Sequence, residues 1–508
     1  MSDTSRLRPP VTGQDPCQEP AYDADHPAPG TRPGAAGRTG TGFGDGTAVR
    51  ARTSLAGSGL LQALTPLLRE WLPRQRWFAG KGRPISGFDL VSAVELLPLD
   101  GRVGGAGLLH LLLDVNQPGV PPDCYQLVLG TRPLLPPPLA PALIGHATGG
   151  PLAGLTVYEA LYDPRLATLL LERLRTPGRT GPLRFSAESG ISIPAGLAPR
   201  LSGIEQSNSS VVYGDTFILK LFRRVSPGAN PDLELPLALA RTGSTRVAAP
   251  VAWVEALGLH GEPATLGVLQ RYLPGSVDGW QLALAAVAAH DDFTGHARSL
   301  GGATAEVHAA LARALPGATL RRQQIRLLAT AMADRLDAAA AAVPALGRYA
   351  ERLRGAFHDL AELSRSAVEL PAQRIHGDLH LGQALHTSAQ GWVLIDFEGE
   401  PARPLSERRR PQSPVQDIAG MLRSFDYAAR HHDPAAPDAA AWAERHRAAF
   451  CAGYAERSGH DPRDARVLLR AYETDKAVYE VLYEARHRPE WLPIPMAAIQ
   501  RLSEPAPR

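Results

Sequence analysis

Cysteine is nearly absent from this sequence of 508 residues. The three cysteines that occur, Cys17, Cys124 and Cys451, are far apart and odd in number. Disulfide frameworks and zinc clusters need paired or closely spaced cysteines, so the sequence argues against both. We therefore expect the protein to work in a reducing cytoplasm.

A surplus of charge and long apolar runs are also missing. Lys+Arg 53 against Asp+Glu 51 leaves a formal net charge of +2. A nucleic-acid-binding domain usually carries a clear basic surplus, so we expect no nucleic-acid partner. No apolar run approaches the ~18–20 residues of a membrane-spanning helix. The first residues also lack the basic and then apolar pattern of a secretion signal, so we expect neither membrane insertion nor secretion.

Lysine is rare among the basic side chains. Only Lys81, Lys220 and Lys476 occur among 53 lysines and arginines. The compact ammonium group and the planar guanidinium group are not interchangeable. A lysine kept in such a chain therefore indicates a position where arginine would serve badly, although chance survival remains the alternative for any one of them.

The stretch from residue 374 to residue 400 has the side chains that phosphoryl transfer requires. Asp378 and Asp396 lie on either side of a short link, and an apolar strand pattern at 392–395 leads to Asp396. Transfer from a magnesium nucleotide needs one carboxylate for the attacking hydroxyl and a second, with a side-chain amide, for the metal. Asp378 is therefore the predicted catalytic residue, and Gln383 and Asp396 are the predicted metal ligands. A short His-Gly-Asp turn alone also occurs by chance.

The whole string carries a family resemblance. His376 to His380, followed by Gln383 and then Asp396, resembles the catalytic and metal loops of the aminoglycoside-phosphotransferase-like small-molecule kinases, which are distant relatives of protein kinases. The sequence motif HGDLHLGQ, together with DFEGEP, resembles that of the actinobacterial maltokinases. Residues 75–83 resemble the start of the maltokinase N-terminal cap. The resemblance covers roughly residues 60–495.

The resemblance implies an α+β, bilobal protein-kinase-like (aminoglycoside-phosphotransferase-like) fold with an N-terminal α+β cap subdomain and a mostly helical C-lobe. The predicted parts are a disordered extension (1–55), the cap (56–180), a nucleotide-binding N-lobe (181–275) and a helical C-lobe with the catalytic loop and acceptor site (276–508). Within the cap, periodicity predicts a helix at 60–71 and strands at 88–97, 108–115 and 125–129. A helix at 157–174 and a linker at 178–181 are predicted to follow.

The predicted nucleotide lobe contains a polar loop and a lysine-bearing strand. The loop has small hydroxyl and amide side chains, namely Ser207, Asn208, Ser209 and Ser210. Such a loop can fold over phosphates and donate backbone N–H groups, although an ordinary turn is the alternative. The loop leads into a predicted strand–turn–strand hairpin, and Lys220 lies on its second strand, as the phosphate-binding lysine does in protein kinases. At the predicted hinge, Gln270 and Tyr272 are expected to lie beside the nucleotide.

Two further acids are assigned supporting roles. The phosphate-binding lysine is normally held by a carboxylate on a nearby helix, and the helix predicted from residue 230 offers Asp232 and Glu234. The family resemblance favours Glu234. Asp417 is expected to hydrogen-bond the catalytic-loop backbone, with His376 also in a supporting role. For Glu234 and for Asp417, the simpler alternative role is to stabilise the N-terminus of a helix through the helix dipole.

The last informative pattern lies on a predicted helix near the C-terminus. Lys476, Tyr479, Glu480 and Tyr483 occur at positions i, i+3, i+4 and i+7, which places them on one helix face. A face of aromatic and charged groups suits a sugar, which offers hydroxyls at its rim and C–H patches on its faces. A tyrosine stripe packed against the lobe, with a surface Lys–Glu pair, is the equally open alternative.

The resemblance implies an ATP- and Mg²⁺-dependent kinase that converts maltose to maltose 1-phosphate for α-glucan synthesis, with an association with trehalose synthase left open. One alternative is another kinase of the group that acts on an aminoglycoside, choline or a different sugar. An aminoglycoside site should be lined with acids, whereas Lys476 favours a neutral sugar. A non-catalytic pseudokinase should lack a catalytic or metal residue, yet Lys220, Asp378, Gln383 and Asp396 are all present.

Overall fold

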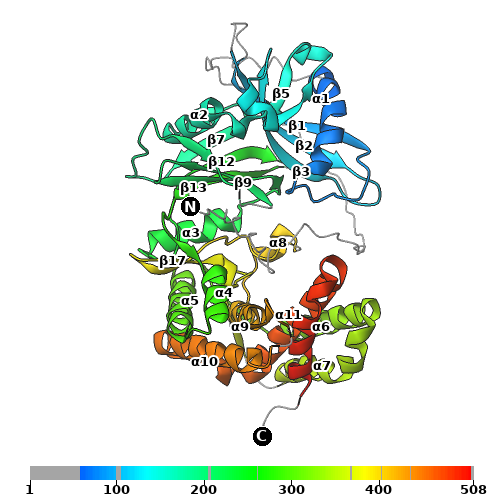
Figure 1. The fold of residues 1–508 in the computed structure, drawn as a ribbon, viewed down its shortest axis with the longest axis vertical. Helices are drawn as coiled ribbons and strands as arrows, with labels where there is room; N and C mark the ends of the chain where they lie inside the picture. The colour runs from blue at the N-terminus through cyan, green and yellow to red at the C-terminus, as the bar shows by residue number, and fades with distance from the viewer. Residues whose placement is uncertain are drawn as a thin grey trace, which may run out of the picture. The chain divides into compact units, whose positions relative to one another are not determined.

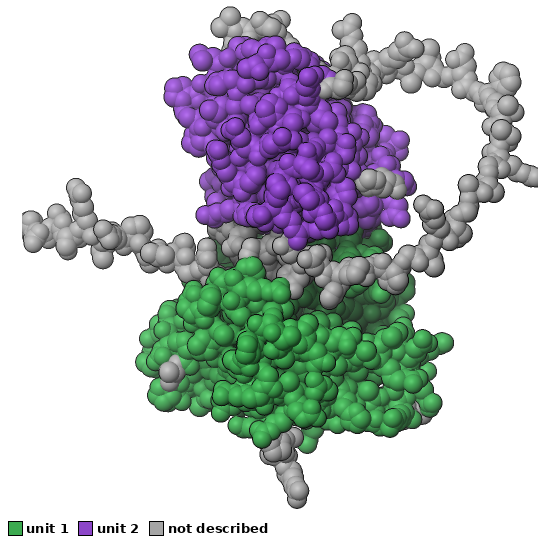
Figure 2. Space-filling model, turned by 90° about the vertical axis from the view of Figure 1, so that its right-hand side faces the viewer, with its two compact units in different colours: residues 1–19, 234–249, 273–508 green, residues 20–233, 250–272 purple. Residues whose placement is uncertain are grey.

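The computed structural model describes residues 58–98, 105–203, 207–259, 261–365, 369–401, 403–434 and 436–504. These residues form two compact units, which Figure 2 colours separately. The N-terminal unit comprises 58–233 and 250–272, and the C-terminal unit comprises 234–249 and 273–504. The extension predicted to be disordered, 1–55, lies outside the described residues. None of the described helices is long and apolar enough to cross a membrane.

The N-terminal unit begins with a helix and an antiparallel sheet (Figure 1). Helix α1 (Ser58–Trp71) and the long strands β1 (Gly87–Leu97), β2 (Gly107–Asn116) and β3 (Asp123–Arg132) confirm the predicted elements. The sheet order is β1-β2-β3-β5-β4, with β5 (Thr156–Glu159), β4 (Leu143–His146) and a short strand β11 (Arg224–Val225) that pairs with β3.

Strand β2 is buried on both of its faces, which explains its almost continuous apolar run. Leu109, Leu111 and Leu113 pack into a core with α1. Leu108 and Leu112 face the opposite way, into a core that includes residues of a second sheet. Successive side chains of a strand point to opposite faces. One strand therefore supplies two cores, and the cap and the predicted nucleotide lobe belong to the same unit. The predicted division between them is not tested by this grouping and stays a prediction.

The second sheet has the order β6-β7-β12-β13-β10-β9-β8. Its strands are β6 (Gly178–Thr180), β7 (Leu183–Ala187), β8 (Pro199–Leu201), β9 (Asn208–Tyr213), β10 (Phe217–Phe222), β12 (Pro250–Leu259) and β13 (Glu262–Arg271). Strands β9 and β10 form the predicted hairpin, and Lys220 lies opposite Ser210 on one side and Val268 on the other. The lysine thus lies on an interior strand of the sheet, paired on both sides.

Two predicted elements of this unit are wrong. Residues 157–174 are not one helix, because β5 and a 3-10 turn at Ala160–Tyr162 precede helix α2 (Pro164–Arg175). Proline is favoured in the first turn of a helix, where Pro164 lies, and the Asp163 side chain caps this end by accepting a hydrogen bond from the backbone N–H of Arg165. Residues 178–181 are not a linker, because β6 pairs with β7 around Gly181, whose φ is 58°.

The C-terminal unit is mostly helical (Figure 1). Helix α3 (Pro231–Arg241) begins in the N-terminal unit and continues in the C-terminal unit. The other helices are α4 (Gly279–Ala289), α5 (Thr294–Ala314), α6 (Arg322–Ala342), α7 (Pro344–Leu363), α8 (Leu405–Arg408), α9 (Val415–Arg430), α10 (Ala439–Ser458), α11 (Arg466–His487) and α12 (Pro493–Ser503). Short sheets, β14-β17-β18 and β15-β16, complete the unit. Their strands are β14 (Val277–Asp278), β15 (Ala318–Leu320), β16 (Leu370–Ala372), β17 (Ala384–Thr387) and β18 (Gly391–Leu394).

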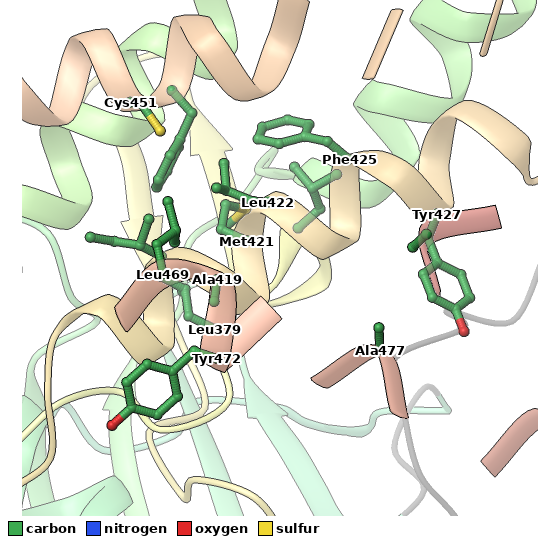
Figure 3. Close-up of a cluster of buried hydrophobic side chains, with 14 of the residues drawn as sticks. Leu379, Ala419, Met421, Leu422, Phe425, Tyr427, Cys451, Leu469, Tyr472 and Ala477 are labelled. Atoms are coloured by element: carbon green, nitrogen blue, oxygen red, sulfur yellow. The ribbon is translucent and has the colours of Figure 1, made fainter. Parts of the chain in front are cut away.

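Helix α9 contributes much of the core beneath the catalytic stretch. Figure 3 shows Met421, Leu422 and Phe425 of this helix among other buried apolar side chains, with Leu379 of the catalytic stretch in the same cluster. The contact is close at Gly420, where an added Cβ would lie 2.6 Å from the carbonyl oxygen of Leu379. The position of the catalytic stretch therefore depends on a small residue in α9.

We expect Gly420→Ala to destabilise the protein by roughly 1–3 kcal/mol, because a methyl group would overlap a backbone oxygen that cannot move freely. Gly355→Ala in α7 is the matched control, since a Cβ there meets no atom within 4 Å. Alanine should stabilise that helix by roughly 0.5–1 kcal/mol. Thermal melts of both variants provide the measurement, and equal melting temperatures would contradict the packing described here.

Candidate active site

Lys220 in the N-terminal unit is paired with an acid of α3. Its Nζ lies 2.9 Å from Oδ2 of Asp232, and the two side chains are 12% and 4% exposed. Asn230 fixes the start of the helix, because its side-chain oxygen accepts a hydrogen bond from the backbone N–H of Asp232. An acid in the first turn also gains from the helix dipole. The lysine is therefore held by a buried carboxylate, as a phosphate-binding lysine requires.

The predicted pairing of Lys220 with Glu234 is wrong. Oε2 of Glu234 instead lies 2.7 Å from Nη1 of Arg374, in the strand-like segment that leads into the catalytic stretch. Residues two positions apart on a helix do not face the same side, so Asp232 and Glu234 cannot both reach one lysine. The sequence alone could not decide which of the two acids faces the sheet.

The predicted phosphate loop is shorter than expected. Asn208, Ser209 and Ser210 belong to strand β9, and Asn208 and Ser210 are buried. Ser207 precedes the strand and is exposed, whereas residues 204–206 lie outside the described residues. The backbone N–H of Ser202 donates to the carbonyl of Ser210, which joins the two ends of the loop. Asn208 and Ser210 lie on the buried side of β9, with Ser209 between them on the other side. The role of these residues toward a nucleotide stays a prediction.

At the end of β13, Gln270 is half-buried and lies opposite Ile218. The backbone N–H of Tyr272 donates to the carbonyl of Thr216 over 2.9 Å. The backbone N–H of Tyr272 is therefore already hydrogen-bonded within the N-terminal unit. Contact of Gln270 and Tyr272 with a nucleotide stays a prediction.

In the C-terminal unit, the catalytic stretch is held by one buried carboxylate. Asp417 is 1% exposed and accepts hydrogen bonds from the backbone N–H groups of His376 and Gly377, each over 2.8 Å. These bonds confirm the predicted contact. His308 Nε2 lies 3.0 Å from Asp417, and its Nδ1 lies 3.1 Å from the hydroxyl of Tyr454. Since a carboxylate only accepts, a neutral His308 donates from Nε2 and accepts at Nδ1.

His376 connects the two halves of the catalytic stretch. Its Nε2 lies 2.8 Å from the carbonyl oxygen of Ile395, and its ring lies 4.6 Å from that of Phe397. Gly377 has a φ of 87°, a conformation that favours glycine. The chain can therefore turn sharply between the buried His376 and the less buried Asp378.

Asp378 forms an ion pair that the sequence did not predict. Its Oδ1 lies 3.1 Å from Nζ of Lys476 on α11, and the two side chains are 14% and 26% exposed. Burial is the largest single influence and would raise the pKa of this carboxyl group, but the charge and hydrogen bond of Lys476, together with His380 and His376, hold the pKa below its usual value. Asp378 is thus ionised, as an acceptor of a hydroxyl proton must be. The scarcity of lysine and the helical spacing of residues 476–483 both singled out Lys476, but neither pointed to Asp378 as its partner.

The two predicted metal ligands lie together. Nε2 of Gln383 donates to Oδ2 of Asp396 over 3.1 Å. Asp396 has a φ of 62°, which is uncommon for a residue with a side chain. A carboxylate and an amide oxygen are ligands that Mg²⁺ prefers, and rotation of the Gln383 amide would present its oxygen instead of its nitrogen. The donor set therefore fits the predicted cation.

The predicted face of α11 is only partly correct. Lys476 Nζ lies 5.2 Å from the centre of the Tyr479 ring, and the rings of Tyr479 and Tyr483 stack with centroids 6.2 Å apart. Glu480, one turn after Lys476, is buried and accepts hydrogen bonds from Nε and Nη2 of Arg423 on α9. It lies about 100° around the helix from Tyr479, so it reaches α9 while the tyrosine rings stack on each other. The structure therefore pairs Glu480 with Arg423, and its contact with substrate stays a prediction.

Asp232→Asn and Lys220→Arg should each cost about a hundredfold in turnover, since an electrostatic contact to the transferring group is worth about 3 kcal/mol. The double variant should lose less than the sum, because the two residues act as a pair. Glu234→Gln is the matched control, and its effect should add to that of Lys220→Arg. Turnover of all variants, with thermal melts, is the measurement. Full additivity of Asp232 and Lys220 would contradict the pairing.

Lys476→Met should move the acid limb of the pH–rate profile to higher pH. Removing the cation leaves burial to raise the pKa of Asp378, so the carboxylate becomes protonated, and inactive as a proton acceptor, at a higher pH than in the wild type. The profile of kcat/KM against pH is the measurement. Lys81→Met is the control, because Lys81 is exposed and contacts only backbone in the N-terminal unit. An unmoved acid limb in Lys476→Met would show that Lys476 does not set this ionisation.

Family models match both parts of the chain. Residues 71–163 match a maltokinase N-terminal cap domain, and residues 196–463 match the phosphotransferase enzyme family. The second match spans more than half of the sequence and includes Lys220, Asp378, Gln383, Asp396 and Asp417.

Curated relatives and solved structures agree with these matches. A glucosamine kinase of Mycolicibacterium smegmatis is 30% identical over 362 residues, which cover 66% of this chain and 88% of the relative. A glucosamine kinase of Streptacidiphilus jiangxiensis is 31% identical over 316 residues, or 58% of this chain and 70% of the relative.

A solved glucosamine kinase structure, at 23% identity, covers 86% of this chain and 98% of its own, with a TM-score of 0.63. A second one, in complex with glucosamine, ADP and inorganic phosphate, has a TM-score of 0.61 over the same shares. These likenesses confirm the predicted kinase-like α+β fold. The chain belongs to the phosphotransferase enzyme family and carries a maltokinase N-terminal cap domain.

Proposed function

We propose that this phosphotransferase is a sugar kinase that transfers the γ-phosphoryl group of ATP to the anomeric hydroxyl of maltose. The observation that carries the proposal is the ion pair between Asp378 and Lys476, which keeps a buried carboxylate ionised beside the aromatic face of α11. The product, maltose 1-phosphate, would feed α-glucan synthesis. A cytoplasmic location and an association with trehalose synthase belong to the same proposal.

In the proposed reaction, Asp378 accepts the proton of the sugar hydroxyl as its oxygen bonds to the γ-phosphorus. The bond between that phosphorus and the β–γ bridging oxygen breaks, and ADP leaves. Asp417 does not touch the sugar but fixes the backbone before Asp378 through its two hydrogen bonds. Lys476 orients the carboxylate and maintains its negative charge.

On the donor side, we assign the phosphates of ATP to Lys220, which Asp232 holds in place. Gln383 and Asp396 would hold Mg²⁺, and a bound Mg²⁺ neutralises charge on the phosphates. Within each unit these groups are already paired and oriented, Lys220 by Asp232 and Gln383 with Asp396.

Two classes of sugar compete for the role of acceptor. The curated relatives are named glucosamine kinases, and their names favour an amino sugar. An amino sugar that carries an ammonium group would be repelled by Lys476, whose Nζ lies 3.1 Å from Asp378. The one acid predicted for this face, Glu480, is neutralised by Arg423. A neutral sugar avoids this repulsion, and the stacked Tyr479 and Tyr483 can contact its C–H faces. These observations favour a neutral sugar over an amino sugar, and the match to a maltokinase N-terminal cap favours maltose among the neutral sugars.

The proposal is tested by ADP release with maltose, trehalose, glucose, glucosamine, choline and kanamycin. Maltose should give the highest kcat/KM, and excess chelator should abolish turnover. Asp378→Asn is the control for chemistry, and it should lower turnover strongly while ADP still binds. Preference for glucosamine would refute the acceptor, and a near-wild-type rate for Asp378→Asn would refute the role of Asp378.

A further inference from the structure

We infer that His296 and His386 form a binding site for a borderline transition-metal cation such as Zn²⁺ on the C-terminal unit. The site differs from the predicted Mg²⁺ site, whose ligands are the side-chain oxygens of Gln383 and Asp396. The inference goes beyond the proposed function, because it concerns a second cation of another chemical class and does not depend on which sugar is the acceptor.

The two histidines come from segments that are far apart in the sequence. His296 lies in the first turn of α5, and His386 lies on β17. Strand β17 is the central strand of its sheet, where His386 pairs with Val277 on one side and with Trp392 on the other. Helix α5 packs against the neighbouring strand β18. The tertiary structure thereby brings the two rings to a distance of 4.9 Å between their centres, with an angle of 84° between their planes.

Aromatic side chains hold both imidazole rings in place. The centre of the Trp392 ring lies 5.0 Å from that of His386 and 5.9 Å from that of His296. Phe293 stacks on His296 with ring centres 5.1 Å apart. The indole N–H of Trp392 donates to the carbonyl oxygen of His296 and also lies 3.0 Å from Oγ of Ser299. Because the rings are ordered before any cation arrives, little conformational entropy is lost when one binds.

The ring nitrogens of both histidines are open to coordination. Within the part of the chain that the structure describes, no ring nitrogen of His296 or His386 forms a hydrogen bond or an ion pair with another residue. His308 and His376, by contrast, use their ring nitrogens to bond a carboxylate and a carbonyl. Both His296 and His386 are half-buried, so part of each remains open to solvent. Burial and the neighbouring His386 lower the pKa of His296, which favours the neutral form that binds metals.

The spacing of the rings fits one tetrahedral ion. Zn²⁺ binds an imidazole nitrogen at about 2.0–2.1 Å, so two imidazoles on one tetrahedral ion have ring centres roughly 5 Å apart. The rings of His296 and His386 already have that separation and are nearly perpendicular. Imidazole is a good ligand for Zn²⁺, Cu²⁺ and Ni²⁺, whereas Mg²⁺ prefers oxygen. Among the described residues no third histidine, cysteine or acid joins this pair, so water would complete the coordination.

The position of the site gives it a structural consequence. The β17–β18 hairpin that carries His386 also connects the predicted Mg²⁺ ligands, because Gln383 directly precedes β17 and Asp396 follows shortly after β18. A cation bound by His386 and His296 would tie this hairpin to α5. An ion that binds the folded chain more tightly than the unfolded chain stabilises it by mass action. We therefore expect Zn²⁺ to raise the melting temperature of the protein.

The test measures Zn²⁺ binding to the full chain by calorimetry, in excess Mg²⁺ so that oxygen sites are occupied. The variants are His296→Gln and His386→Gln. His358→Gln is the matched control, because His358 is a 70% exposed histidine on α7 that lies beside Glu362. Each of the first two changes should weaken Zn²⁺ binding by about tenfold or more, and the control should leave it unchanged. Zn²⁺ should raise the melting temperature of the wild type and the control, but not that of the other variants.

The double variant separates a shared site from two independent ones. It should bind Zn²⁺ no more weakly than either single variant, because one imidazole alone no longer forms the site. Additive losses, or unchanged Zn²⁺ affinity in either single variant, would overturn the inference and leave the two rings with a packing role only.

A labelling experiment on the wild type covers the case in which a variant does not fold. Diethyl pyrocarbonate modifies histidine nitrogens, and mass spectrometry locates the modified residues. Zn²⁺ should protect His296 and His386 together and should leave His358 reactive. Equal labelling of His296 and His386 with and without Zn²⁺ would overturn the inference.

Discussion

The hydrogen bonds that Asp417 accepts are the constraint on which the C-terminal unit depends. One carboxylate binds two consecutive backbone N–H groups, those of His376 and Gly377, and so fixes the turn that places Asp378. His308 also contacts the Asp417 carboxylate, and the Tyr454 hydroxyl contacts His308. The nearly inaccessible carboxylate therefore has partners on several sides. An unpaired buried carboxylate would be costly, and here the paired one determines where the catalytic residue lies.

Buried charges also position the helix on the acceptor side. Arg423 and Asp426 of α9, Arg447 of α10, Glu473 and Glu480 of α11, and Arg501 of α12 form a connected set of ion pairs. The set balances three positive against three negative groups. Because a guanidinium group makes bonds in fixed directions, it restricts how the helices can slide past each other. The place of Lys476 relative to Asp378 therefore depends on residues that do not face the acceptor side.

The N-terminal unit uses buried polar groups in a similar way. His110 lies 2.8 Å from Gln126, and burial lowers the pKa of His110 to about 4, so the imidazole is neutral near pH 7. Gln126 then joins β3 to the second sheet, and Arg223 adds a charged link beside it. Apolar packing alone tolerates small shifts between sheets, whereas hydrogen bonds of fixed length do not. These bonds therefore fix the cap sheet against the second sheet of the same unit.

Local patterns and a family resemblance were sufficient for much of the architecture. Helical spacing predicted α1, and apolar strand patterns predicted the strands β1 to β3 and the β9–β10 hairpin, because these patterns depend on the chain's own geometry. The same patterns failed at 157–174, because Pro164 and the helix N-cap residue Asp163, and not the apolar spacing, set the start of α2. They also failed at 178–181, where glycine allows a tight turn between paired strands as readily as a linker.

For the candidate site, the sequence by itself determined the residue types and their order: a lysine on a central strand, Asp378 after a turn, and Gln383 with Asp396 after it. Only the tertiary structure decided which groups meet. Asp232 pairs with Lys220 while Glu234 pairs with Arg374, and Glu480 pairs with Arg423 while Lys476 pairs with Asp378. Asp232 and Glu234 are two positions apart on one helix, which directs them to different sides, whereas Lys476 and Glu480 are one turn apart and reach different partners because α11 packs between those partners. Which side faces the partner is set by how the helix packs, and the partners lie far away in the sequence.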